Sequence, residues 1–239
     1  YNIPGRVMLA AAPSNQNVVY AVYAAGSNTQ LSEGYGTYIG KYIIKTNNKG
    51  SSWTEVNIPP DESGRNWAYL AWHALTISVD PNNENTLYIG GLDVHKSTDG
   101  GNTWNKVSDW VLMYYGGGNE YIHADQHAIM YKPGSSSEII FGCDGGVFYT
   151  STGNQSQPVF NEASTGYNTL QFYSCAISPG SGSNTYLGGL QDNGSLIYQG
   201  NPFSPNDMIS GGDGAYCFFD EDQSDIIITS VYEIGRAHV

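Results

Sequence analysis

The sequence predicts an all-β fold of the β-propeller class, and three observations carry this prediction. A pair of strands recurs along the chain, a specific turn motif follows two copies of the pair, and the composition suits a β protein rich in loops. The 239 residues include 30 Gly and 19 Tyr, whereas charged residues make up 13% of the chain. This charged fraction is about half of the usual share, yet 40% of the residues are apolar, which indicates an ordered chain.

The recurring unit is a strand that ends in Pro or an acidic turn, then a short polar loop, then a second strand that ends near Gly. In four copies the closing prolines, Pro13, Pro81, Pro133 and Pro179, follow one another at spacings of 68, 52 and 46 residues. A repeat of this length is typical of a propeller blade with variable insertions. The paired strands are predicted at 7–13 with 18–22, 75–81 with 86–91, 128–133 with 139–142, 175–179 with 185–189, and 216–221 with 225–229.

Taken in order, the first repeat is the longest because it contains an insertion at about 26–36, and the fifth copy lacks its Pro. We interpret residues 1–232 as one propeller domain in which about five blades are visible. Since a propeller hides its sheet edges by closing on itself, we expect these blades to be part of a larger propeller. Residues 233–239 resemble a translated sequencing adapter, and we interpret them as a non-native tail.

A turn motif completes two of the units. Residues 97–104 fit the pattern S-x-D-x-G-x-T-W, and residues 46–53 carry conservative replacements at the same offsets. In such a turn, Asp and Ser bond to nearby backbone groups, Gly takes a positive φ, and Trp packs back between neighbouring blades. We therefore expect structural roles for Ser97, Asp99, Gly101, Thr103, Trp104, Asn48, Gly50 and Trp53.

This motif resembles the Asp-box (BNR) repeat of sialidase-like propellers, the sortilin ectodomain and glycoside hydrolase family 74. Segments 123–127, 143–146, 171–173, 188–194 and 211–214 also resemble, in order and spacing, large secreted bacterial Asp-box proteins, many of them described as family-74-like. The resemblance covers most of residues 6–232. It implies a secreted or cell-surface protein.

Propeller ligands usually bind at the mouth of the central channel, beside the innermost strands. His123, Asp125 and His127 alternate just before one such strand, and an extended backbone would place all three on one face. Three interpretations stay open for this row: a metal corner, a row that binds sugar hydroxyls, or a hydrogen-bond network that supports the channel.

When the repeats are aligned on their closing Pro, three successive blades carry a polar residue at the same position. His73, Asp125 and Gln171 each lie eight residues before the Pro of their blade. Trp72 and Tyr173 lie beside this position, where they could stack on a sugar ring or fill the space between blades. We interpret His123, Asp125, His127, His73, Trp72, Gln171 and Tyr173 as candidate substrate-binding residues.

Asp144, Asp192 and Asp213 are the candidate catalytic residues, because a glycosidase needs two carboxyl groups that flank the scissile bond. Residues 143–146 resemble the D-x-G-G segment that carries a catalytic carboxylate in family 74. Asp-Gly is also a very common turn dipeptide, so a structural role for each Asp stays open.

Composition excludes several classes of function. The net charge of −13 argues against nucleic acid as a partner, and no apolar stretch is long enough for insertion into a membrane. A sialidase uses three Arg to hold its substrate carboxylate, but the chain contains only Arg6, Arg65 and Arg236, the last of them in the predicted tail. There is no phosphate-binding or dinucleotide-binding motif, and the three cysteines lack metal-site spacing. We expect no cofactor and no bound metal.

Our interpretation is a secreted Asp-box propeller that resembles glycosyl hydrolases acting on a neutral polysaccharide through paired carboxylates. The alternative is a non-catalytic propeller that binds a glycan, or an extracellular protein or peptide as the sortilin resemblance implies. A purely structural surface module is the third reading. Whether the protein is an enzyme depends on how the candidate carboxylates are arranged.

Overall fold

The computed structural model describes residues 4–26, 38–61, 64–167, 169–180, 182–201, 206–231 and 234–238. The insertion predicted at 26–36 therefore lies outside the described residues, apart from Gly26. The chain divides into two compact units, Tyr1–Gly166 and Tyr167–Val239, which we describe separately. No helix among the described residues has the length and apolarity needed to cross a lipid bilayer.

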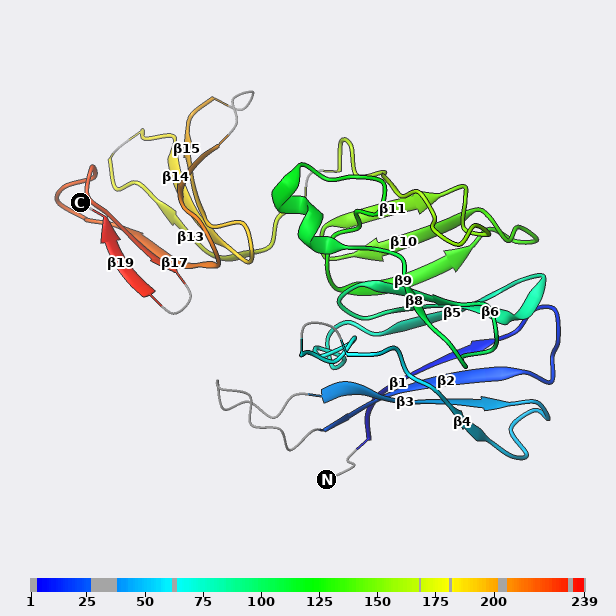
Figure 1. The fold of residues 1–239 in the computed structure, drawn as a ribbon. Helices are drawn as coiled ribbons and strands as arrows, with labels where there is room; N and C mark the ends of the chain where they lie inside the picture. Colours follow the sequence, from blue (N-terminus) through cyan, green and yellow to red (C-terminus); the bar gives the residue numbers. More distant parts are fainter. Residues whose placement is uncertain are drawn as a thin grey trace. The chain divides into compact units, whose positions relative to one another are not determined.

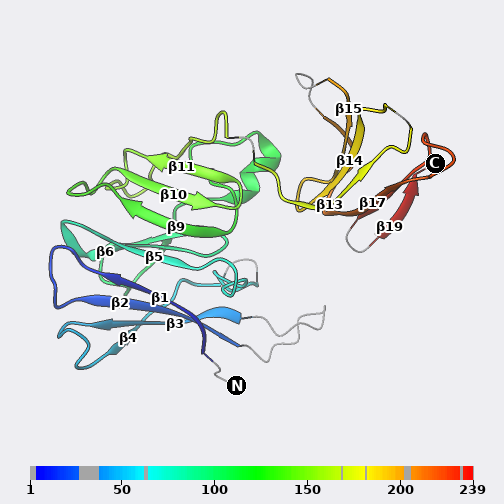
Figure 2. The ribbon, with the colours of Figure 1, turned by 180° about the vertical axis from the view of Figure 1, so that it is seen from behind.

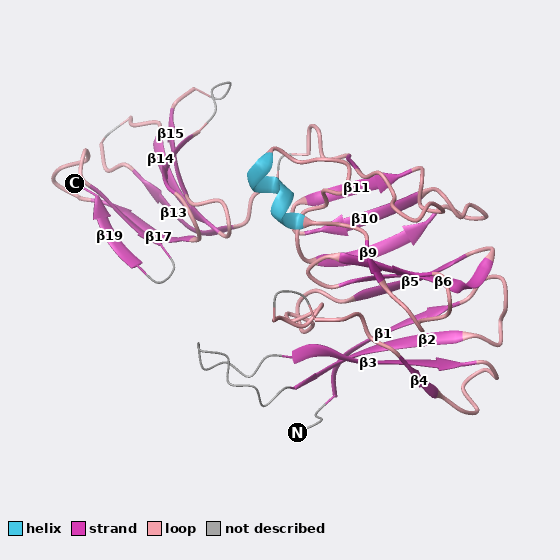
Figure 3. Cartoon of the chain, viewed as in Figure 1, coloured by secondary structure: helices cyan, strands magenta, loops and turns pink. Residues whose placement is uncertain are grey.

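The first unit contains three antiparallel sheets, and in each of them four strands follow one another in chain order (Figures 1 and 3). Blade 1 consists of β1 (Pro4–Ala11), β2 (Val19–Gly26), β3 (Tyr38–Thr46) and β4 (Thr54–Val56). Blade 2 consists of β5 (Thr76–Asp80), β6 (Asn83–Gly90), β7 (Val94–Ser97) and β8 (Asn105–Lys106). Blade 3 consists of β9 (Gln126–Tyr131), β10 (Ile139–Cys143), β11 (Gly146–Thr150) and β12 (Asn161–Glu162).

The second unit repeats the same plan. Blade 4 contains β13 (Phe172–Ile177), β14 (Thr185–Leu190), β15 (Ser195–Gln199) and β16 (Asp207–Ser210). Blade 5 contains β17 (Gly214–Phe219), β18 (Ile227–Val231) and β19 (Ile234–His238). The last strand falls in the segment that we interpret as a non-native tail, and its backbone pairs with β18 from Ile234 to His238.

The predicted all-β propeller class is confirmed in these sheets. All five predicted strand pairs coincide with the first two strands of a blade, and the described residues contain a single helix, the 3₁₀ helix η1 (Trp110–Tyr115). In the first unit the three blades lie face to face, as both ribbon views show (Figures 1 and 2). Their first strands β1, β5 and β9 lie next to one another, which is the arrangement of propeller blades around an axis.

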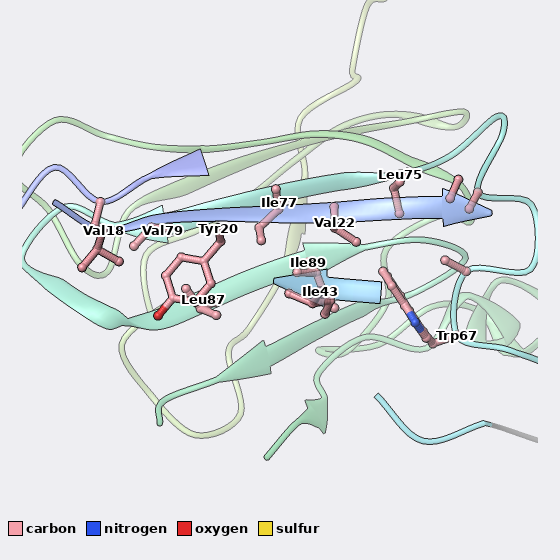
Figure 4. Packing of buried hydrophobic residues seen from close by; sticks show 14 residues of the cluster. Val18, Tyr20, Val22, Ile43, Trp67, Leu75, Ile77, Val79, Leu87 and Ile89 are labelled. Atoms are coloured by element: carbon pink, nitrogen blue, oxygen red, sulfur yellow. The ribbon is translucent and has the colours of Figure 1, made fainter. Parts of the chain in front are cut away.

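The core between blades 1 and 2 follows from the alternation of apolar residues along the strands. Tyr20, Val22, Leu87 and Ile89 are fully buried, and their side chains meet between the two sheets (Figure 4). Trp67 closes one end of this cluster. Burial of such side chains contributes roughly 1.5–3 kcal/mol each relative to exposure.

Trp67 anchors the loop that leads from β4 to β5. Its ring packs against Gly40, where an added Cβ would lie 2.5 Å from the indole, and its Nε1 donates a hydrogen bond to the Gly40 carbonyl at 3.2 Å. The backbone of Gly40 also donates to the carbonyl of Ala68 at 2.9 Å. The loop is thus fixed a few residues before Trp72 and His73, two of the candidate site residues.

Blades 2 and 3 share an aromatic core and polar contacts. Phe141 and Phe148 of blade 3 are buried together with Tyr88 of blade 2. The Tyr88 hydroxyl donates to the carbonyl of Gly153 at 2.6 Å. The buried Lys96 ammonium group donates to the carbonyls of Gly153 and Gln155 at 2.7 and 2.6 Å. These contacts fix the two blades against each other.

The turn at 97–104 is closed by hydrogen bonds among its own residues. The Ser97 hydroxyl donates to Asp99 Oδ1 at 2.8 Å, and the backbone N–H groups of Gly101 and Thr103 donate to Ser97 Oγ and Asp99 Oδ1 at 2.9 Å each. Gly101 has a φ of +91°, as expected for this position. Trp104 Nε1 donates to the carbonyl of Asn57 at 2.8 Å, beside the core of blades 1 and 2.

The turn at 46–53 has the same local pattern. Asn48 Oδ1 accepts hydrogen bonds from the Thr46 hydroxyl at 2.8 Å and from the Ser52 backbone at 2.9 Å. Gly50 has a φ of +88°. Trp53, in contrast, is 41% exposed. The assignment of both turns to the Asp-box family stays a prediction.

Candidate functional site

The candidate site of the first unit is centred on the carboxylate of Asp144, which two imidazole rings contact. His73 Nε2 lies 3.0 Å from Asp144 Oδ2, and His127 Nε2 lies 2.5 Å from Asp144 Oδ1. The two rings are 4.8 Å apart at an interplanar angle of 81°. His73 comes from the loop before β5, His127 from β9 and Asp144 from the turn between β10 and β11. The site therefore combines residues of blades 2 and 3.

A tight turn positions Asp144. Asp144 and Gly145 lie between Cys143 and Gly146, which pair across the hairpin. Gly146 has a φ of +118°, and a Cβ on Gly145 would lie 2.3 Å from Cγ of His123. The hairpin therefore requires glycine at both positions. His123 packs against this turn, and its Nδ1 lies 3.2 Å from the Ala124 carbonyl.

Asp125 lies beside the cluster in an unusual backbone conformation. Its φ is +63°, in the left-handed region, which is uncommon for a residue other than glycine. Its carbonyl accepts the backbone N–H of Asp144 at 3.2 Å, so it supports the turn. One carboxylate oxygen, Oδ1, is buried and has no hydrogen-bond partner among the described residues. Unpartnered polar atoms and left-handed residues of this kind cluster at functional sites.

The two carboxyl groups are shifted in opposite directions. Burial raises the pKa of Asp125, and the negative charge of Asp144 raises it further against the opposing effect of the histidines. For Asp144, burial also raises the pKa, but the hydrogen bonds and charges of His73 and His127 outweigh burial, so its pKa lies below the usual value. Opposite shifts of neighbouring carboxyl groups are typical of acid and base pairs in catalytic sites.

Trp72 presents an exposed aromatic surface at the site. Its side chain is 58% exposed, and its ring lies 5.5 Å from that of His73 at an angle of 47°. The guanidinium of Arg6 donates a hydrogen bond to the carbonyl of His73, which ties the loop to β1. An exposed ring next to polar side chains could stack on the apolar face of a ligand.

The ligand atoms of His73, His127 and Asp144 all lie within 4.8 Å of one another. Two imidazole nitrogens and a carboxylate oxygen could hold a metal ion as well as bind a hydroxyl.

The sequence prediction for the row 123–127 is wrong in one respect. It assumes an extended backbone that places His123, Asp125 and His127 on one face, but the left-handed φ of Asp125 interrupts that backbone. As a result His127 joins Asp144, whereas His123 packs against Gly145. The pairing of His73 with Asp144 spans 71 residues, and sequence reasoning missed it. The signal that came closest to predicting this pairing was the alignment of His73 and Asp125 at the same position of successive blades.

The remaining candidates belong to the second unit. Asp213 Oδ1 accepts the backbone N–H of Asp192 at 2.6 Å, so its carboxylate is engaged in closing a turn. Asp192 itself has a φ of +57°. The carbonyl of Gln171 accepts the backbone N–H of Gln191, and Tyr173 is 53% exposed on β13.

Sequence reasoning also missed a cavity whose wall is in backbone contact with Asp125. Its volume is about 360 Å³, and the residues that line it include Arg65, Trp67, Leu92, Asp93, Lys106 and Trp110. The Leu92 carbonyl accepts the backbone N–H of Asp125 at 3.1 Å, so the cavity wall and the site share a backbone contact. Burial raises the pKa of Asp93, although the charge of Lys106, 3.0 Å away, opposes this effect.

Comparison with known proteins gives a local sequence match and a set of similar folds. No protein-family model matches the chain. Over 72 residues the chain is 38% identical to a xyloglucanase of Hypocrea jecorina, and this match covers 29% of the chain and 8% of that enzyme. The chain thus spans a small part of the length of the curated relative.

Among solved structures, the chain is similar to the GH74 xyloglucanase from Xanthomonas campestris, with 16% identity and a TM-score of 0.45 over 95% of this chain and 35% of that one. It is also similar to the GH74 enzyme of Niastella koreensis, with 19% identity and a TM-score of 0.43 over 94% of this chain and 33% of that one. A third similar structure is YCF48 from Cyanidioschyzon merolae, with 10% identity and a TM-score of 0.29 over 95% and 92% of the two chains. The fold assignment itself rests on the blades described above.

Proposed function

We propose that this chain belongs to a glycoside hydrolase-like propeller that cleaves a neutral polysaccharide of the β-glucan type, with Asp144 as the reacting carboxylate. The observation that carries the proposal is the position of Asp144: its carboxylate is partly exposed, it contacts two imidazole rings, and one of these rings, that of His73, lies beside the exposed Trp72. The match to a xyloglucanase supports a polysaccharide as substrate. We therefore also propose that the protein acts outside the cell.

Hydrolysis of a glycosidic bond needs one ionised and one protonated carboxyl group. Asp144 suits the ionised role because both of its oxygens accept hydrogen bonds from histidine. Asp125 is the candidate for the second carboxyl group, since it lies next to Asp144 and has an oxygen that is buried without a partner. Trp72 would stack on a sugar ring, and the cavity lined by Trp110 and Arg65 would hold a neighbouring part of the polysaccharide chain.

The test is an assay of the full chain on xyloglucan, mixed-linkage β-glucan and cellulose, with reducing ends measured as product. We expect turnover by the unaltered chain and its loss in Asp144→Asn. Glu138→Gln is a suitable control, because Glu138 pairs with Lys132 on an exposed part of blade 3. Turnover that persists in Asp144→Asn would remove Asp144 from the mechanism.

A non-catalytic binding propeller is the second candidate, and one observation favours it. Both oxygens of Asp144 are already engaged by histidines, which is the state of a carboxylate in a rigid binding surface. In that case the chain would bind a glycan, or an extracellular protein or peptide, through Trp72 and the adjoining cavity. Binding to polysaccharide in affinity electrophoresis, with no reducing ends released, would support this candidate against hydrolysis.

The two turns at 46–53 and 97–104 complete the proposal. We assign both to the Asp-box type, in which they stabilise the hairpins of their blades and take no part in binding. Their hydrogen bonds among residues of the same turn support this assignment.

A further inference from the structure

We propose that His73, His127 and Asp144 form a binding site for one divalent transition-metal ion. The site is of the type in which two histidines and one carboxylate hold the metal and leave its other positions open. This inference goes beyond polysaccharide hydrolysis. It concerns the same carboxylate, so a metal ion and the reacting sugar would exclude each other at Asp144.

The geometry of the three side chains carries the proposal. Both histidines direct Nε2 toward the carboxylate, at 3.0 and 2.5 Å from its two oxygens, and the ligand atoms all lie within 4.8 Å of one another. A metal ion bound at about 2.0–2.2 Å from each ligand would join ligand atoms that are roughly 3–3.5 Å apart. Small movements of the two rings are therefore sufficient to admit an ion.

The ligands are also accessible and preorganised. The side chains of His73, His127 and Asp144 are 34%, 35% and 27% exposed, so an ion can enter from solvent. His73 belongs to blade 2 and the other two to blade 3, and the contacts of Lys96 and Tyr88 hold these blades together. A site whose ligands are already in place loses little entropy when it binds.

The chemistry of the ligands limits the choice of metal. Imidazole nitrogen suits Zn²⁺, Co²⁺, Ni²⁺ and Fe²⁺, whereas Ca²⁺ and Mg²⁺ prefer sites built of oxygen ligands. Three protein ligands leave a coordination position for water.

His123 provides a matched control within the same site. It lies four residues from His127, but its ring packs against Gly145 and its Nδ1 contacts the Ala124 carbonyl. It is not among the convergent ligands. His123→Gln should therefore reduce metal affinity far less than His73→Gln or His127→Gln.

The experiment uses the full chain without an affinity tag, because added histidines would bind metal themselves. The protein is stripped with EDTA, dialysed, and titrated with Zn²⁺ in a calorimeter. We expect one site per chain, and an affinity at least about ten-fold lower in each of His73→Gln and His127→Gln. Circular dichroism of each variant confirms that the sheets are intact. Absence of Zn²⁺ binding, or an equal loss in His123→Gln, would overturn the assignment.

A second measurement keeps the proposal testable if a variant does not fold. Co²⁺ added to the unaltered chain should give visible absorption bands of a nitrogen-coordinated ion, and Zn²⁺ should displace them. A spectrum equal to that of aqueous Co²⁺ would overturn the site. Hydrolysis is assayed separately in EDTA, so loss of the proposed hydrolysis leaves the metal result standing. Where both hold, Zn²⁺ should inhibit hydrolysis by the unaltered chain and not by a His73→Gln chain that remains active.

Discussion

The turn between the second and third strands differs between blade 3 and blade 4, although both turns contain an Asp with a Gly one or two positions after it. In blade 3 the turn contains Asp144 and Gly145, and the Asp144 carboxylate receives two imidazole rings. In blade 4 the turn spans 190–194, and it is the backbone N–H of Asp192 that is bound, by the Asp213 carboxylate that precedes β17. Similar hairpins thus use their acidic residues in different ways.

The difference teaches that an Asp and a nearby Gly favour a turn, whereas the neighbouring residues determine the chemistry of that turn. Asp144 meets a histidine from blade 2 and another from β9, so its charge is stabilised while it stays accessible. The carboxylate of Asp213 closes the adjacent turn, as Asp side chains commonly do for backbone N–H groups. A catalytic or metal-binding role is therefore supported at Asp144, and a turn-stabilising role at Asp213.

The largest expected effect is on catalytic activity, which should depend on Asp144 in the turn of blade 3. Asp144→Asn keeps the shape of the side chain but removes its charge, so polysaccharide hydrolysis should fall by about 10²–10⁴-fold, the usual contribution of a general acid or base. Glu138→Gln should retain the rate of the unaltered chain. The measurement is the release of reducing ends under conditions of equal folded protein. A full rate in Asp144→Asn would remove the functional distinction between the turns.

The second effect concerns the glycines of the same two turns. A Cβ on Gly145 would lie 2.3 Å from the His123 ring, whereas a Cβ on Gly194 would lie 2.0 Å from the backbone oxygen of Ser210, at a φ of +67°. A ring can move more easily than a backbone, so Gly194→Ala should destabilise more than Gly145→Ala. We expect losses of about 1–3 kcal/mol, with Gly194→Ala at the upper end. Urea denaturation would measure the order, and the reverse order would contradict this account.

A smaller effect is expected for the carboxylate that closes the turn of blade 4. Asp213→Ala leaves the Asp192 N–H without its acceptor and should cost about 1 kcal/mol of unfolding free energy. Asp213→Asn retains an oxygen acceptor and should recover most of the loss. Thermal denaturation of the two variants tests this comparison, and equal melting temperatures for Ala and Asn would show that the hydrogen bond contributes nothing.

The smallest expected effect is on the pH dependence of stability, and it compares the turns at 97–104 and 46–53. Burial raises the pKa of Asp99, but the hydrogen bonds from Thr103 and Ser97 outweigh it, and the net pKa lies below the usual value. Because the folded pKa is lowered, Asp99 stabilises the protein above about pH 4, the usual pKa of Asp, and this stabilisation is lost as the pH falls through the folded pKa.

In Asp99→Asn, the melting temperature should therefore fall less steeply as the pH is lowered. The turn at 46–53 already has Asn48 at the same offset and should contribute no such dependence. The test is to measure the melting temperatures of the unaltered chain and of Asp99→Asn between pH 2 and 7, in steps of roughly half a unit. The slopes of the two curves against pH are then compared. Parallel curves would contradict the assigned role of Asp99.

The strands could be predicted from the sequence because their signals are local. Alternation in 75–81 and 86–91, closed by Pro81 and Gly91, leads directly to β5 and β6. The turn at 97–104 is equally local, since its hydrogen bonds join residues two to four positions apart.

The site could be predicted only in part, because its geometry depends on packing between blades. Asp144, His73 and His127 were each singled out, but their convergence requires blade 2 to lie against blade 3. The left-handed backbone of Asp125 has only a weak signal, because Asp adopts this conformation far less often than Gly. The roles of Asp192 and Asp213 likewise depend on two segments that meet across a turn.

The contacts of Lys96 and Tyr88 with the turn after β11 have a consequence for how the first unit opens. Pulling blade 2 away from blade 3 would break these hydrogen bonds and expose the apolar core that Tyr88 shares with Phe141 and Phe148, which is unfavourable. The two blades should therefore exchange their amide hydrogens as one cooperative unit. Since His73 lies on the loop that enters blade 2 and Asp144 lies on blade 3, the site should persist only while the two blades stay packed, and fraying of a single outer strand should leave it intact.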